Sequence, residues 1–123
     1  MDVLLNEEQM MLQTSARDFL ETECPPSLVR DMEEDGNGYP PDLWRKIVDL
    51  GWVGMALPED CGGQGLPLTY QAIILEEVGR ALAPLPLHST VVPALTIAMD
   101  GTSEQRAAWL PSVAGGDVIL TWA

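Results

Sequence analysis

The sequence predicts an all-α fold, an orthogonal bundle of about five to six helices, with an incomplete β-strand at the C-terminus. Three observations predict this fold. Apolar residues recur at helical spacing along most of the chain. Side chains suited to capping precede several of these periodic segments. Ten prolines and eleven glycines separate the segments from one another. The 123 residues are enough for one domain with a hydrophobic core.

The first helix is predicted to begin after Asn6, whose side chain forms a capping box with Gln9. One apolar stripe follows, and it consists of Leu12, Ala16, Phe19, Leu20 and Cys24. Pro25-Pro26 ends this helix. The acidic segment 27–35 is predicted to form a short helix that the turn Gly36-Asn37-Gly38 ends.

Pro40-Pro41 suits the start of the next helix, because proline is tolerated in the first turn. Its apolar stripe consists of Leu43, Ile47 and Leu50, with Trp44 and Val48 beside it. Gly51 suits the position just after its end. The apolar segment 52–57 is too short for a helix, and we expect an extended, buried connection there.

The chain is organised around a glycine-rich corner, Leu57-Pro58-Glu59-Asp60-Cys61-Gly62-Gly63-Gln64-Gly65. Its glycines favour a backbone with positive φ or a close approach. It lacks a preceding strand, a Lys-Ser/Thr pair and dinucleotide spacing, so we interpret it as structural and not as a phosphate-binding loop. The corner leads into a central helix from Pro67 or Leu68 to Ala81 or Leu82, which we expect to be buried nearly all round.

The segment 87–99 is predicted to be helical, with a kink at Pro93 or a start near it. Thr102 and Gln105 form a second capping box, which starts a helix that Pro111 interrupts and Gly115-Gly116 ends. The last residues are β-branched and aromatic, which is typical of a strand. We therefore expect the chain to be cut off within a strand.

The charge balance excludes some functions. Six Lys and Arg stand against 19 Asp and Glu, which gives a net charge of −13. Such a chain is unsuited to nucleic acid or to an anionic membrane surface. The sequence shows no secretory signal and no apolar run long enough for a membrane span without proline or charge. We expect a soluble, cytoplasmic protein.

Cysteine and histidine usage bears on metal binding. Cys24 and Cys61 lack metal-ligand spacing, and His88 is the single histidine, so we predict no metal site. We expect both cysteines to be buried free thiols, although the sequence alone leaves a disulfide between them open.

The order and spacing of several motifs together resemble the N-terminal helical domain of the acyl-CoA dehydrogenase family. The motifs are Leu5-Asn6-Glu7-Glu8-Gln9, the glycine corner followed by Glu76-Glu77-Val78-Gly79-Arg80, and Gly101-Thr102-Ser103-Glu104-Gln105 leading to Trp109-Leu110-Pro111. The resemblance assigns residues 1–117 to this helical domain and 118–123 to the start of a β-domain. It covers about the first third of a typical family member.

The resemblance implies a subunit that binds FAD and removes hydrogens from Cα and Cβ of an acyl-CoA thioester. In the family, a carboxylate takes the α-proton and the flavin N5 takes a hydride. The base and most flavin contacts lie in later domains, beyond Ala123. We therefore predict no catalytic residue in this chain, no activity of the chain alone, and no retention of FAD by it. The resemblance also implies a homo- or hetero-oligomer of dehydrogenase subunits.

The same resemblance suggests four site residues. With the chain aligned on Gly101, the positions facing the acyl pocket are Leu85, His88 and Val92. Trp122 matches an aromatic position close to the flavin ring. The residue pattern alone favours ordinary packing or surface exposure for the first three, and a frayed chain end for Trp122.

Other interpretations stay open. Glu76 and Glu77 invite assignment as a catalytic base, but we expect them to be solvated or paired with a neighbour such as Arg80. The chain could also be a non-catalytic helical interaction module, acting alone or as the partner subunit of a dehydrogenase. Acyl-CoA oxidation or nitroalkane oxidation on the same fold stays open too, because the deciding residues lie after Ala123.

Overall fold

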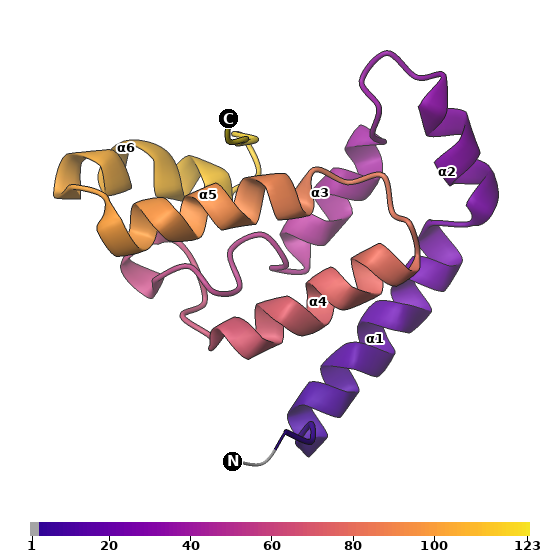
Figure 1. The fold of residues 1–123 in the computed structure, drawn as a ribbon, viewed down its shortest axis with the longest axis horizontal. Coiled ribbons are helices and arrows are strands. Elements are labelled where there is room, and N and C mark those ends of the chain that lie inside the picture. The colour runs from indigo at the N-terminus through magenta and orange to yellow at the C-terminus, as the bar shows by residue number, and fades with distance from the viewer. Residues whose placement is uncertain (1–2) are drawn as a thin grey trace.

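The computed structural model describes residues 3–123, and within them the regular structure is entirely helical (Figure 1). The elements are α1 (Glu7–Glu23), α2 (Pro26–Glu33), α3 (Pro41–Asp49), the short 3₁₀ helix η1 (Glu59–Cys61), α4 (Leu68–Arg80), α5 (Leu87–Asp100) and α6 (Ser103–Ala114). Helix α1 packs against α4, and α5 packs against α6, which also contacts η1. The predicted all-α fold is confirmed.

Both predicted capping boxes are present. The Asn6 side chain accepts a hydrogen bond from the Gln9 backbone N–H at 2.8 Å, and the Asn6 N–H donates to Gln9 Oε1 at 3.0 Å. Thr102 and Gln105 make the same exchange at 3.1 and 2.9 Å. These bonds satisfy backbone groups that have no partner inside the helix, which fixes where α1 and α6 begin.

One hydrophobic core joins five of the helices and the connection after α3. Its most deeply buried large side chains include Leu20, Ile47, Val53, Leu57, Ile74, Leu87, Val91, Leu110 and Val113. Cys24 and Cys61 lie in the same core as buried free thiols, which confirms the prediction for both. Helix α2 has no fully buried residue and packs only its half-buried Leu28 and Val29 against this core.

The glycine corner folds back on the segment before it. The backbone N–H of Gly63 donates to the Pro58 carbonyl at 3.0 Å, and that of Gly65 donates to the Leu57 carbonyl at 2.8 Å. Gly62 and Gly65 have φ of +85° and +63°, a left-handed conformation that glycine adopts without steric cost. The corner thereby holds Pro58 beside the start of α4.

The buried connection 52–57 is wound into turns, so the prediction of an extended segment is wrong. Two hydrogen bonds explain the turns, because the Gly54 carbonyl accepts from Leu57 N at 3.2 Å and from Gln64 N at 2.9 Å.

Two burial predictions also fail. Leu50 is 50% exposed, and α4 is not buried all round, since Leu68 in its first turn is 61% exposed.

Neither proline inside a helix interrupts it. Pro93 lies within α5 and Pro111 within α6, so the predicted interruption at Pro111 is wrong, and α5 does not start near Pro93. A proline removes one backbone hydrogen bond of the helix. One neighbour of each proline is fully buried, Ala94 beside Pro93 and Leu110 beside Pro111, and this packing keeps both helices continuous.

Residues 118–123 belong to no strand, and residues 3–123 contain no strand with which they could pair. The tail is held on α5, where the Leu120 N–H donates to Thr90 Oγ1 at 3.3 Å. A β-ladder needs a partner, so the C-terminal strand, and with it the domain boundary after residue 117, stays a prediction.

Candidate functional site

An apolar hollow of about 520 Å³ lies between the glycine corner, α4 and α5. Its wall consists of Ala56, Pro58, Leu68, Gln71, Leu75, Val91, Val92, Leu95, Thr96, Ala98 and Met99. Small-molecule sites in proteins have volumes of roughly 300–1,000 Å³ and mostly apolar walls with a few polar groups. The hollow has this size and this composition.

Helical spacing explains which residues of α4 and α5 line the hollow. On α4, Leu68, Gln71 and Leu75 follow one another at intervals of three and four, which is one face of a helix. On α5 the same spacing brings Val92, Thr96 and Met99 to the hollow. At its rim, the side chains of Leu68 and Met99 are 61% and 80% exposed, so part of the wall is open to solvent.

One of the two polar side chains in this wall, that of Gln71, is unusual. Gln71 is fully buried, and its Nε2 donates to the Trp52 carbonyl at 3.0 Å. Its Oε1 accepts no hydrogen bond from any protein group among residues 3–123. Leaving a buried acceptor unpaired costs about 1–3 kcal/mol. An unpaired buried group beside a hollow of ligand size points to a binding site.

The structure brings only one of the three predicted acyl-pocket residues to this hollow. Val92 lines it and is half-buried. Leu85 lies before α5 and packs against the core, and His88 is exposed on the first turn of α5. Sequence reasoning missed Gln71, although a polar residue in the apolar stripe from Leu68 to Leu82 was a signal that could have found it.

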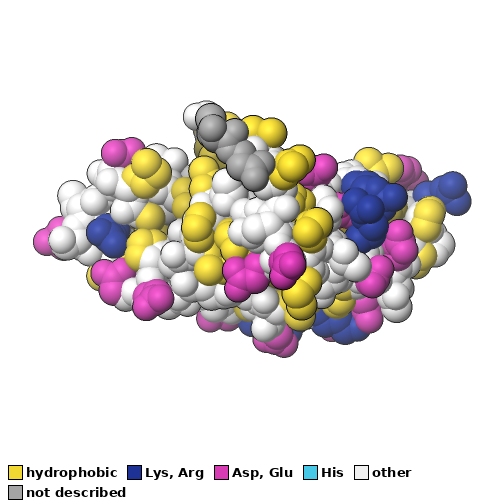
Figure 2. Space-filling view, turned by 90° about the horizontal axis from the view of Figure 1, so that it is seen from below, with side chains coloured by type: hydrophobic (Ala, Val, Ile, Leu, Met, Phe, Trp, Pro, Cys, Tyr) yellow, Lys and Arg dark blue, Asp and Glu magenta, His cyan; other side chains and the backbone are white. Residues whose placement is uncertain are grey.

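The predicted flavin neighbour, Trp122, is 66% exposed in the C-terminal tail. Five of the six basic residues are paired with carboxylates on other segments of the chain; they are Arg17, Arg45, Lys46, Arg80 and Arg106. Acidic side chains spread across the face of the molecule shown in Figure 2, with apolar side chains exposed between them. Scattered, paired cations do not suit a pyrophosphate group, so the described residues do not fit a complete FAD site.

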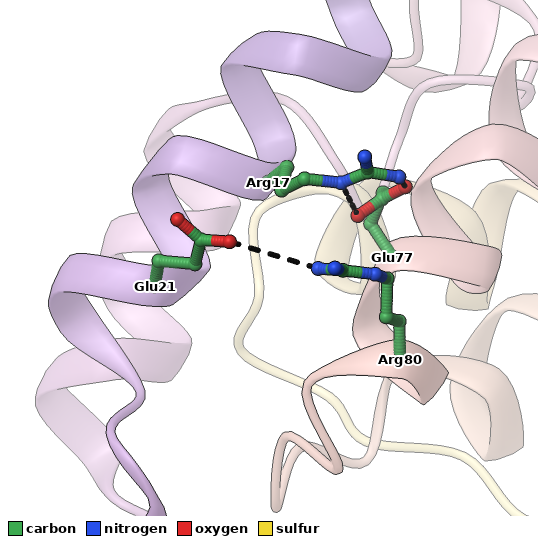
Figure 3. A network of polar contacts seen from close by, with 4 residues as sticks. All are labelled: Arg17, Glu21, Glu77 and Arg80. Atoms are coloured by element: carbon green, nitrogen blue, oxygen red, sulfur yellow. Dashed lines mark hydrogen bonds and ion pairs between the residues drawn. The ribbon is translucent and has the colours of Figure 1, made fainter.

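Glu77 serves a structural purpose (Figure 3). Its carboxylate is 1% exposed and binds the Arg17 guanidinium through two hydrogen bonds, at 3.0 Å from Nε and 2.7 Å from Nη2. This hydrogen-bonded pair raises the pKa of Arg17 above its ordinary value. The pairing of Glu77 with Arg80 is not observed, because Arg80 lies 3.7 Å from Glu21 instead. The Arg17–Glu77 pair joins α1 to α4.

Among residues 3–123, no three or more side chains of histidine, cysteine or acidic type come together as metal ligands. None of the helices in the described range is long and apolar enough to cross a membrane.

The architecture is thus an all-α domain that presents an apolar hollow between two of its helices. Residues 6–117 match the family model described as the acyl-CoA dehydrogenase N-terminal domain. The chain belongs to the acyl-CoA dehydrogenase family, as the sequence motifs predicted.

The chain spans about a third of the length of the first curated relatives it matches. It is 34% identical to the acyl-CoA dehydrogenase IpdE2 of Mycolicibacterium smegmatis over 101 residues, which are 81% of this chain and 32% of the relative. Among solved structures, the ChsE4-ChsE5 complex from Mycobacterium tuberculosis matches with a TM-score of 0.88 and 31% identity, over 98% of this chain and 34% of that one. An acyl-CoA dehydrogenase from Bacillus anthracis complexed with FAD matches with a TM-score of 0.81 and 27% identity, over 94% of this chain and 20% of that one.

Proposed function

We propose that this chain is the N-terminal part of an FAD-dependent acyl-CoA dehydrogenase, an oxidoreductase that removes hydrogens from Cα and Cβ of an acyl-CoA thioester. The observation that carries the proposal is the family match over residues 6–117. The apolar hollow between α4 and α5 supports it, because an acyl chain needs an apolar wall of this kind.

In this proposal α5 forms part of one wall of the acyl pocket. Val92 is the strongest candidate for contact with the acyl group, because its side chain lines the hollow. Leu85 and His88 extend the wall toward the N-terminal end of α5. The exposed imidazole of His88 would present a polar group to an acyl chain there.

FAD in the complete protein would accept the hydride that leaves the substrate. We propose that Trp122 lies beside the flavin ring, which its exposed position in the tail allows. The chain alone is proposed not to retain FAD, since residues 3–123 do not fit the whole cofactor. Most flavin contacts and the catalytic base would then come from protein outside these residues.

A second candidate is a subunit that pairs with another dehydrogenase subunit without doing the chemistry itself. The observation that favours it is the match to the ChsE4-ChsE5 complex, which is an assembly of two different proteins. Under either candidate we propose an oligomer of dehydrogenase subunits, homomeric or heteromeric. A cytoplasmic location is likewise a proposal that rests on the sequence.

A chimera tests the proposal. Residues 6–117 would replace the matching segment of the Bacillus anthracis enzyme, and the purified chimera would be titrated anaerobically with saturated acyl-CoA thioesters of increasing length. We expect the chimera to retain FAD and its flavin absorbance to bleach when an acyl-CoA is added. A folded chimera with full flavin that no acyl-CoA bleaches would contradict the proposed wall and favour the partner-subunit candidate. The unaltered enzyme serves as the control.

A further inference from the structure

We propose that the hollow between α4 and α5 selects acyl groups that carry a hydroxyl on their tail, and that the side-chain carbonyl of Gln71 recognises this hydroxyl. The inference deepens the proposed function and rests on it, because it takes the occupant of the hollow to be an acyl group. It adds the chemical class of that group.

The polar content of the wall carries the inference. Of the eleven residues that line the hollow, only Gln71 and Thr96 have polar side chains. The Thr96 hydroxyl donates to the Val92 carbonyl at 3.1 Å, within its own helix. The Gln71 amide donates through Nε2 to the Trp52 carbonyl at 3.0 Å. The atom left without a partner among residues 3–123 is Gln71 Oε1.

An unpaired acceptor selects a donor. A carbonyl oxygen can only accept hydrogen bonds, so the complementary ligand group carries an O–H or N–H. The other nine side chains of the wall are apolar, which suits a hydrocarbon body around a single donor. A site with one buried acceptor in an apolar wall binds a ligand that donates to that acceptor more tightly than a ligand that does not. A hydroxyl on an otherwise hydrocarbon acyl tail meets both conditions.

Access to Gln71 is through the rim. Oε1 exposes less than 1 Å² to solvent, so neighbouring side chains must move slightly before a donor reaches it. Met99 at the rim is 80% exposed, and an unbranched methionine side chain changes its rotamer readily. Gln71 itself is held in place by its bond to Trp52 O, which keeps the acceptor in a defined position.

The test uses the 123-residue chain and three matched probes, so it needs neither flavin nor turnover. The probes are pantetheine thioesters of octanoate, 7-hydroxyoctanoate and 7-oxooctanoate. Dissociation constants would be measured by ¹H–¹⁵N NMR titration, in which the Gln71 side-chain amide gives its own signal. We expect the hydroxy probe to bind about two- to tenfold more tightly than the octanoyl probe, the range for one net hydrogen bond. The oxo probe should bind no more tightly than the octanoyl probe.

Two variants sharpen the result. Gln71→Met keeps the side-chain length and removes the acceptor, so it should abolish the advantage of the hydroxy probe over the octanoyl probe. Thr96→Val, on the facing helix, should keep that advantage. If Gln71→Met does not fold, the ranking of the three probes on the unmodified chain decides alone.

Where the probes bind, three results would overturn the inference: equal binding of the octanoyl and hydroxy probes, a preference for the oxo probe, or a hydroxy advantage that survives in Gln71→Met. Equal binding, with shifts confined to α4 and α5, would leave the proposed acyl wall standing while removing the role of Gln71. Binding of no probe would overturn the inference and count against the acyl wall as well.

Discussion

Replacing Gly63 with alanine tests how tightly the glycine corner is packed. A Cβ atom added at Gly63 would overlap the carbonyl group of Leu57 and lie 2.6 Å from its Cβ. Leu57 is 1% exposed, so it has little room to move. Its carbonyl also accepts the hydrogen bond from Gly65 N at 2.8 Å, which a shift of the carbonyl would lengthen. The substitution must therefore disturb both the core and the corner.

The expected cost follows from these two contacts. Overpacking a core position costs about 1–3 kcal/mol, and a weakened hydrogen bond adds about 0.5–1.5 kcal/mol. We expect Gly63→Ala to lower the free energy of unfolding by about 2–4 kcal/mol. Urea unfolding followed by tryptophan fluorescence measures this, because Trp44 and Trp52 are buried at 3% and 4% exposure.

Gly36 provides the matched control, because an added Cβ there meets nothing within 4 Å. Gly36→Ala should change the free energy of unfolding by less than about 0.5 kcal/mol. If Gly63→Ala is as stable as Gly36→Ala, the close approach of Gly63 to Leu57 does not hold the corner together, and the reasoning is refuted.

Three further predictions follow from local contacts. Asn6→Ala removes the cap of α1 and should cost about 1 kcal/mol, with faster hydrogen exchange confined to the first turn. Glu77→Ala should lower the urea midpoint more than Glu76→Ala, because Glu77 is buried against Arg17 whereas Glu76 is exposed; equal midpoints would contradict this. Burial raises the pKa of the Cys24 thiol above its ordinary 9.0, so the folded chain keeps a proton that the unfolded chain loses. Stability should therefore fall as pH rises above about 9, and less steeply in Cys24→Ala.

Features set by neighbouring residues could be predicted from the sequence. The capping boxes at Asn6 and Thr102 depend on residues three positions apart, and both were found. The connection 52–57 was mispredicted because its turns depend on Gln64, ten positions after Gly54 in the chain. The continuity of the helix through Pro111 depends on the burial of Leu110 and likewise could not be seen locally.

The candidate site depends even more on residues that lie far apart in the sequence, so it was harder to predict. Val92 was found through family resemblance, whereas the hollow is assembled from the glycine corner and two helices. Helical spacing places Gln71 on an apolar stripe, but its unpaired Oε1 becomes visible only once Trp52 is known to hold its Nε2. The partner of Glu77 lies 60 positions away, at Arg17, so local sequence favoured the nearer Arg80 instead.

The most direct test of the proposed acyl wall is anaerobic flavin bleaching in the chimera that carries Val92→Trp. The larger side chain would fill the hollow beside α4. The acyl-CoA concentration at half-bleaching should therefore rise about tenfold or more above that of the unmodified chimera, with FAD content unchanged. Met11→Trp is the matched control, because Met11 lies on α1 and is 71% exposed; it should bleach like the unmodified chimera. If Val92→Trp bleaches at the same acyl-CoA concentration as Met11→Trp, Val92 does not contact the acyl group and the proposed wall is wrong.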